Sequence, residues 1–287
     1  MRQIVAGLSA VLLTALLSGC SVLPSLIRSQ PQTTHGPQEQ PIIRPHQAFR
    51  SVYVCADISS SVSSRFLHQF LHPLADAIDR AVVPNSDGAI FIVHWIGANS
   101  WTPDADALTI TIPAIQADPL PPKSRSYPVA TGDPFAEAQA HQSVDEANTN
   151  AQAQYQQQLH RLHTHLAKVR AAVHQQTQRL RSLTWPIDAI QTDVFGCVER
   201  ASLYFTHAHG TKVLLIASDL INNTFDEYVS GSMHLTGVKV KIAWYCADAP
   251  VCMSVEAQWR QFLRDAGAQS VEFYDPVQIQ TLPDLLA

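Results

Sequence analysis

A carboxylate and two hydroxyls occupy alternate positions in the segment Asp57-x-Ser59-x-Ser61. A β-rich run over residues 51–56 precedes them, so these side chains are expected at the carboxyl end of a strand. Their oxygens suit a hard cation, because Mg²⁺ prefers near-octahedral oxygen ligands at about 2.0–2.1 Å and keeps several waters, which leaves room for an outside ligand. The alternative is structural, since Asp57 and Ser59 are also residue types that cap the start of a helix.

This pattern resembles the metal-ion-dependent adhesion site of von Willebrand factor type A domains, where it follows the leading β-strand. That family also has a Thr on a later loop immediately before a helix, and Thr192 stands in this context. It has an Asp at the end of its fourth strand, and Asp219 follows the apolar run 212–217. The resemblance covers residues 49–116 and 184–280.

The resemblance implies a site for Mg²⁺ or Mn²⁺ built from five side chains: Asp57, Ser59, Ser61, Thr192 and Asp219. The serines would coordinate through their hydroxyls, and the aspartates would supply negative charge directly or through water. The Thr would join when a carboxylate from a protein partner completes the metal's shell. Asp193 is either an acceptor behind these ligands or a helix-start charge favoured by the helix dipole.

Short apolar runs alternate with helical stretches from residue 49 onward. The expected strands are 51–56, 89–96, 108–112, 212–217, 238–245 and 271–274. The expected helices are 66–83, 194–206 and 255–266. This order predicts an α/β fold with a doubly wound, mainly parallel sheet covered by helices on both faces, of the von Willebrand factor type A or Rossmann-like kind. Ligands in such sheets bind at the carboxyl ends of the strands.

Residues 117–183 interrupt this pattern with a proline-rich crossing and then a helical stretch that starts at Asp133-Pro134. Apolar residues then step by four and three, in the heptad pattern of a coiled coil: Tyr155, Leu159, Leu162, Leu166, Val169 and Val173. The stretch 134–183 is either one helix about 75 Å long at 1.5 Å per residue, or a hairpin broken at 148–150. The stripe makes it a candidate for self-association into a homo-oligomer.

Five basic residues and no acidic ones lie between residues 151 and 183: Arg161, Lys168, Arg170, Arg179 and Arg181. They form either a solvated helix face or an arm that grips an acidic partner or phospholipid head groups. The whole chain has a formal net charge of -5, which argues against a protein that coats nucleic acid.

The chain starts with a basic residue and an apolar run over residues 4–17, which is too short to span a bilayer and is typical of a signal peptide. The run ends in Leu-Ser-Gly-Cys, which resembles the lipobox of bacterial lipoproteins. The resemblance implies removal of residues 1–19 and acylation of Cys20. Ser21 in the next position implies the outer membrane in a double-membraned cell, and the outer face of the cytoplasmic membrane otherwise.

Residues 20–48 are rich in Pro, Gln, Ser and Thr and are expected to be a disordered tether, because they cannot bury enough apolar surface to offset the entropy of ordering. A globular domain over residues 49–287 would therefore hang from the membrane, interrupted by 117–183. Without Cys20, four cysteines remain. Cys246 and Cys252 flank a short loop and are the leading disulfide pair, which leaves Cys55 with Cys197. The alternative is buried free thiols.

These features favour a membrane-tethered binding module of the cell envelope that recognises a protein partner through a divalent cation. One alternative is an envelope scaffold that self-associates through the helical insertion. The other is a Mg²⁺-dependent hydrolase with Asp57 as nucleophile, although such sites usually have a second Asp where this chain has Ser59. The chain shows no Gly-rich phosphate loop, no G-x-S-x-G elbow and no HExxH motif.

Overall fold

The computed structural model describes residues 46–129, 132–184, 190–224, 233–246 and 249–274. The strands are β1 (Arg50–Asp57), β2 (Ala89–Ile96), β3 (Asp106–Ile112), β4 (Thr211–Ser218), β5 (Val238–Trp244) and β6 (Ser270–Tyr274). The helices are α1 (Ser64–Arg80), the short 3₁₀ helix η1 (Pro103–Ala105), α2 (Pro134–Arg181), α3 (Val194–His207) and α4 (Ala249–Asp265). The predicted signal peptide, Cys20 and most of the predicted tether lie outside the described residues.

The strands form one sheet in the order β3-β2-β1-β4-β5-β6. Strand β1 pairs in parallel with both β2 and β4, β4 pairs in parallel with β5, and β5 with β6. At the other edge, β3 runs antiparallel to β2. The predicted α/β class with a mainly parallel sheet is therefore confirmed, and its central strands read as apolar runs because helices bury both faces.

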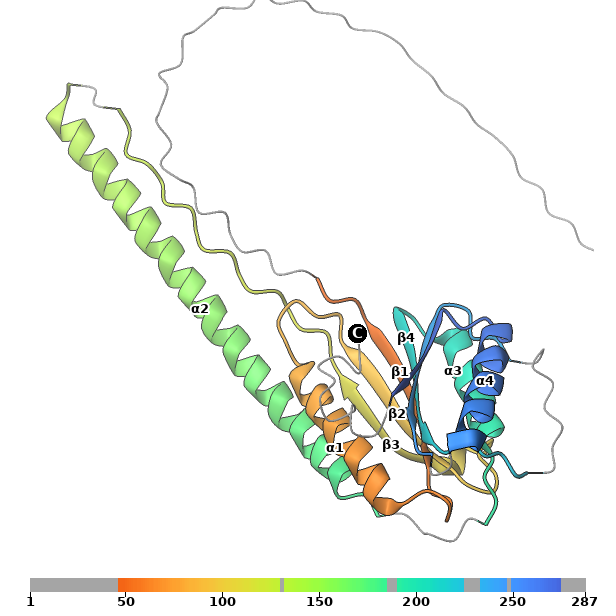
Figure 1. Ribbon diagram of the computed structural model, residues 1–287. Coiled ribbons are helices and arrows are strands. Elements are labelled where there is room, and N and C mark those ends of the chain that lie inside the picture. Colours follow the sequence, from red (N-terminus) through yellow and green to blue (C-terminus); the bar gives the residue numbers. More distant parts are fainter. Residues whose placement is uncertain (1–45, 130–131, 185–189, 225–232, 247–248, 275–287) are drawn as a thin grey trace, which may run out of the picture. The chain divides into compact units, whose positions relative to one another are not determined.

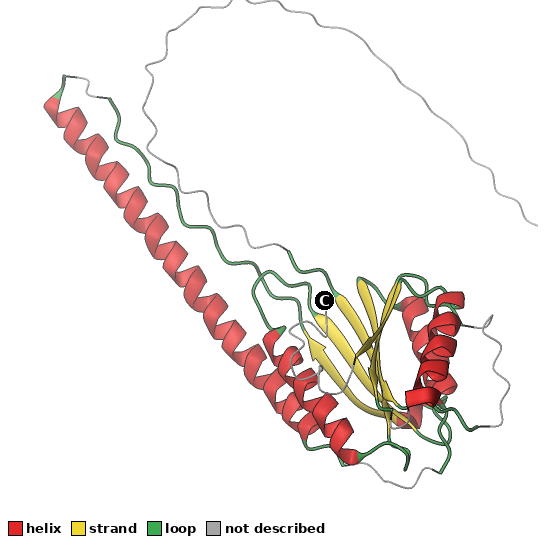
Figure 2. Ribbon diagram, viewed as in Figure 1, coloured by secondary structure: helices red, strands yellow, loops and turns green. Residues whose placement is uncertain are grey.

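The two faces of the sheet carry separate apolar cores, as the alternation of side chains along β1 shows. Val52, Val54 and Ala56 belong to the core under α1 and α2. Tyr53 and Cys55, which point to the opposite face, belong to the core under α3 and α4. Figure 1 shows these helix pairs on either side of the sheet, and Figure 2 shows the strands between them.

Helix α2 is continuous over 48 residues, so the alternative of one long helix is confirmed and the alternative of a hairpin broken at residues 148–150 is wrong. It starts as predicted, with Asp133 accepting hydrogen bonds from the backbone N–H groups of Phe135 and Ala136. In the described part of the chain, no helix is both long enough and apolar enough to cross a membrane.

An extended segment lies alongside the N-terminal half of α2 (Figure 2). Asn148 on the helix binds this segment. Its side chain accepts a hydrogen bond from the backbone N–H of Arg125 at 2.7 Å and donates one to the backbone carbonyl of the same residue at 3.3 Å. Nearby, the Tyr127 hydroxyl donates to Asp145 at 2.7 Å, and its ring stacks on His141. Asn148, where the hairpin alternative placed a break, instead attaches the proline-rich crossing to the helix.

The C-terminal half of α2 is part of the apolar core. Its buried apolar side chains join the core under α1: Leu162, Leu166, Val169, Val173 and Leu180. The heptad stripe therefore packs within the chain over most of its length. This leaves the part around Tyr155 and Leu159 for self-association, and both of these residues are half-buried.

Two of the five basic residues of α2 bind groups of the same chain. Arg170 donates to the backbone carbonyl of Val82, and Arg181 forms ion pairs with Asp76 and Asp79 of α1. The other three, Arg161, Lys168 and Arg179, are exposed and lie at spacings of seven and eleven residues, which place them on one line along the helix. Part of the basic stretch therefore binds to α1 and to Val82 just after it, and the rest is exposed.

We expect Leu166→Ala to lower the free energy of unfolding by about 2–5 kcal/mol, because Leu166 is 4% exposed and its loss leaves a cavity between α2 and α1. Chemical denaturation followed by circular dichroism measures this change. Gln158→Ala, an exposed position on the same helix, is the control and should change stability by less than about 0.5 kcal/mol. Equal stabilities for the two variants would show that α2 does not contribute to the core.

Candidate metal-binding site

The carboxyl ends of β1, β2 and β4 meet at one edge of the sheet because the three strands are parallel neighbours. Asp57 is the last residue of β1, and Asp219 directly follows β4. Next to them, the backbone N–H of Ile58 donates to the carbonyl of Ile96 at the end of β2. The topology therefore brings the two predicted carboxylates to the same edge, as open α/β sheets do for ligand sites.

Asp57 is fully buried, and both of its carboxylate oxygens accept hydrogen bonds. One oxygen accepts from the backbone N–H of Ser59 at 2.8 Å, and the other from the hydroxyl of Ser218 at 2.5 Å. Burial raises the pKa of Asp57 to about 6, against the opposing effect of these hydrogen bonds, and the nearby charge of Asp219 raises it further. A buried carboxylate next to a second one is an environment that a cation would stabilise.

The Ser59 and Ser61 hydroxyl oxygens lie 3.0 Å apart in the loop that leaves β1. Adjacent oxygens around an octahedral Mg²⁺, each about 2.0–2.1 Å from the metal, are about 3 Å apart, so this spacing fits two neighbouring ligands. Ser59 is buried, whereas Ser61 is exposed. The alternative that Asp57 and Ser59 cap α1 is wrong, because the side chain of Ser63 caps this helix.

Thr192 is held beside the loop that follows Asp219. Its backbone N–H donates to the side-chain oxygen of Asn223 at 2.6 Å, and its carbonyl accepts from the Asn223 backbone at 3.1 Å. Asn222 makes a similar connection by accepting from the backbone N–H of Phe195 at 3.2 Å. Two asparagines that were not predicted as site residues thus attach the start of α3 to the end of β4.

Asp193 caps α3 and connects it to the loop after β2. One carboxylate oxygen accepts from the backbone N–H of Gly196 at 2.8 Å, and the other from the backbone N–H of Ser100 at 3.0 Å. Its own backbone N–H donates to the carbonyl of Gly97 at 2.8 Å. Asp193 is therefore a helix-start residue, as one of the two alternatives had it, and it also fixes the position of its neighbour Thr192.

A buried histidine that the sequence analysis missed supports the loop that Asp193 binds. His94 is fully buried on β2, with Nδ1 2.6 Å from a carboxylate oxygen of Asp106 and Nε2 2.6 Å from the carbonyl oxygen of Ser100. The sequence signal was a single titratable residue within the apolar run 89–96. Since Ser100 also donates to Asp193, the polar contacts run from the β3 edge to the start of α3.

The turn after β4 holds Leu220 at φ 63°, in the left-handed region that a leucine rarely adopts. Ser218 stabilises this turn by accepting from the Leu220 backbone N–H at 2.8 Å while its hydroxyl donates to Asp57. The indole N–H of Trp259 donates to the Leu220 carbonyl at 2.9 Å, and the leucine side chain is buried in the core. Such strain persists where surrounding contacts over-determine it.

Both disulfides form with the pairing that the sequence favoured, so the alternative of free thiols is wrong. Cys55 on β1 bonds to Cys197 on α3, with their Cα atoms 6.1 Å apart. Cys246 bonds to Cys252, with Cα atoms 6.0 Å apart. Helix α4 starts at residue 249 rather than at 255, so this second bridge joins the end of the β5 segment to the first turn of α4. The first bridge ties α3 to β1 two residues before Asp57.

Within the described residues there is no group of three or more His, Cys, Asp or Glu side chains arranged to hold a metal. The five predicted ligands are of a different kind, since two are carboxylates and three are hydroxyls. Hydroxyl and carboxylate oxygens suit Mg²⁺ or Mn²⁺ rather than a metal that prefers nitrogen or sulfur. The donor set therefore fits a hard cation.

No protein-family model matches this chain, and no curated protein matches it. Two solved structures of proximal thread matrix protein 1 from the mussel byssus are similar to it, with TM-scores of 0.39 and 0.38 and sequence identities of 12% and 10%. The matches cover 82% and 83% of this chain but 44% and 46% of the mussel chains, so this chain spans less than half of their length.

We expect Asp57→Asn to raise the unfolding free energy of the metal-free protein at neutral pH by about 1–3 kcal/mol, because the buried charge is removed. The folded state binds the Asp57 proton more tightly than the unfolded chain does. The wild-type unfolding free energy should therefore fall as pH rises from 3.8 to about 6 and stay level above this. Urea denaturation in EDTA across this range measures both effects.

Asp145→Asn is the control, since that carboxylate is on the exposed part of α2 and receives its hydrogen bond from Tyr127. The control should reproduce the wild-type dependence of stability on pH. A variant at position 57 that is less stable than wild type at neutral pH, without metal, would contradict the assignment of a destabilising buried charge.

Proposed function

We propose that this protein is an extracytoplasmic binding module, tethered to a membrane through Cys20, that recognises a carboxylate of a protein partner through Mg²⁺ or Mn²⁺. The proposed metal ligands are Asp57, Ser59, Ser61, Thr192 and Asp219, in a domain of the von Willebrand factor type A kind. The bound cation would supply a positive centre with open coordination positions, and the side chains would hold it at the carboxyl edge of the sheet.

One observation carries this proposal: the predicted ligands come from three distant parts of the sequence and lie at one edge. Asp57 and Asp219 end neighbouring parallel strands, and Ser218 beside Asp219 donates to Asp57. The double hydrogen bond between Thr192 and Asn223 adds the third part. The mainly parallel sheet is the class of sheet that the proposed kind of domain requires.

Hydrogen bonds and a disulfide connect the loops and helices at this edge. Asp193 binds the loop after β2, the Cys55–Cys197 disulfide binds α3 to β1, and Ser218 supports the turn after β4. A metal-dependent binding site requires ligand side chains that a rigid scaffold holds in the right geometry. The structural supports are therefore those that the proposed function needs.

We expect Mg²⁺ or Mn²⁺ to bind the purified protein with one-to-one stoichiometry, and Ser59→Ala to weaken this binding at least about tenfold, because even losing an outer-shell partner costs about 10–100-fold. Isothermal titration calorimetry measures the affinity. Ser60→Ala is a closely matched control, since Ser60 is an exposed serine of the same loop and is not a proposed ligand. Equal affinities for the two variants, or no binding to wild type, would refute the metal site.

We expect the wild-type protein to retain an envelope protein in Mg²⁺ and to release it in EDTA, because a partner carboxylate would complete the cation's shell. Pull-down from a detergent-solubilised envelope fraction, followed by mass spectrometry, measures retention. The Ser59→Ala protein should retain less of the same partner, and the Ser60→Ala protein as much as wild type. If neither EDTA nor Ser59→Ala reduced retention, the partner would bind without the metal, which would contradict the proposal.

A further inference from the structure

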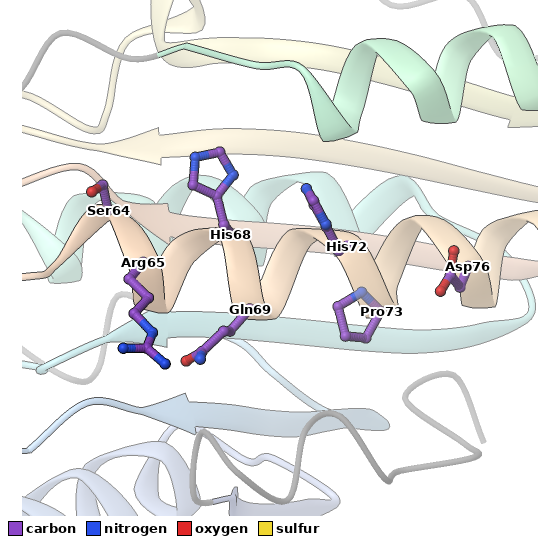
Figure 3. Close-up of a pocket in the computed structure, with 7 residues that line it drawn as sticks. All are labelled: Ser64, Arg65, His68, Gln69, His72, Pro73 and Asp76. Atoms are coloured by element: carbon purple, nitrogen blue, oxygen red, sulfur yellow. The ribbon is translucent and has the colours of Figure 1, made fainter.

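Two histidines project from the same face of α1 (Figure 3). His68 and His72 are four residues apart, which places them one turn apart on one side of a helix. Their ring centroids are 5.6 Å apart, and the ring planes meet at 72°. Figure 3 shows both imidazoles rising from the same side of the helix, with Asp76 one turn further along.

The spacing of the rings is close to that of two imidazoles on one metal ion. A metal–nitrogen distance of about 2.0–2.1 Å places the ion about 3 Å from each ring centroid, so two tetrahedral ligands have centroids about 5 Å apart. The observed 5.6 Å needs a small rotation of the side chains to reach this geometry. Pairs of histidines at this helical spacing are an established way of binding Zn²⁺.

Both histidines are exposed and line an open depression of about 600 Å³. The helix beneath them is held rigidly, because its opposite face is fully or almost fully buried in the core: Phe66, Leu67, Phe70, Leu71 and Leu74. A rigid helix lowers the entropy lost when two side chains bind one ion. The pair is therefore accessible and its backbone is preorganised.

The charges around the depression tolerate a bound cation. Asp76 lines it on the histidine side, although its carboxylate forms an ion pair with Arg181 at 2.5 Å. In Figure 3, Arg65 and Gln69 project from the other side of α1 and not between the two rings. Because Asp76 is paired with Arg181, we do not assign it as a ligand. Water would fill the remaining coordination positions of the ion.

From this geometry we propose that His68 and His72 chelate a divalent transition-metal ion of the Zn²⁺, Ni²⁺ or Cu²⁺ class. These ions favour imidazole nitrogen, whereas Mg²⁺ and Mn²⁺ favour carboxylate, hydroxyl and water oxygens. The histidine pair and the Asp57 edge therefore select different metals. The proposal does not depend on the proposed function, because the two sites share no ligand.

Calorimetric titration of the purified full-length protein with Zn²⁺, in saturating Mg²⁺, tests this proposal. We expect one Zn²⁺ site that His68→Ala and His72→Ala each weaken at least about tenfold, because each removes half of the protein's ligands. His165→Ala is the matched control, since it is an exposed histidine on α2 with no histidine three or four residues away on either side. This control should bind Zn²⁺ as wild type does.

A second measurement locates the ion independently of the affinity. Paramagnetic Ni²⁺ should broaden backbone NMR signals of α1 around His68 and His72 in wild type and leave them sharp in the double alanine variant. Circular dichroism should show unchanged helicity in that variant, because both side chains are exposed. Zn²⁺ affinity that is unchanged by both substitutions, or reduced as much by His165→Ala, would overturn the proposal. Broadening confined to residues outside α1 would also overturn it.

The same variants separate this proposal from the Mg²⁺ site. Ser59→Ala should leave Zn²⁺ binding intact, and His72→Ala should leave Mg²⁺ binding intact, if each site stands alone. Zn²⁺ binding abolished by Ser59→Ala would overturn the histidine assignment, because it would place the transition metal at the sheet edge. Loss of Mg²⁺ binding in Ser59→Ala with Zn²⁺ binding retained supports both.

Discussion

The parallel pairing of β1 with β2 on one side and β4 on the other is the constraint on which the candidate site depends. It aligns Asp57 with the end of β2 and sets it beside Ser218, so two carboxylates and a hydroxyl converge on one edge. The burial that parallel strands require also removes water from Asp57, which raises its pKa to about 6. Fold and site chemistry thus have one cause.

Helix α1 lies between the sheet, the long helix α2 and the solvent. One face is buried against the sheet, and another packs against the C-terminal half of α2, where Asp79 accepts from Thr177 and pairs with Arg181. The face that remains carries His68 and His72. Because two sides of the helix are fixed by packing, its exposed side is a rigid platform, which is what a two-ligand site needs.

The long helix α2 serves two physical roles along its length. Its C-terminal half supplies apolar side chains to the core, and its N-terminal half is polar and pairs with the extended segment through Asn148 and Asp145. The capping signal at Asp133-Pro134 predicted the start of the helix and periodicity predicted its apolar stripe, yet neither could tell whether the stripe would meet another copy or α1. A stripe shows that a face is buried, without showing against what.

The sequence by itself determined the order of strands and helices, the α/β class, the pairing of cysteines favoured by their number and spacing, and which residues at strand ends are candidate ligands. Local patterns decide these properties because periodicity and capping act over a few residues. Only the tertiary structure decided that Ser218, Asn223 and His94 support the site, and that β3 runs antiparallel. These contacts join residues far apart in the chain, and no local pattern contains them.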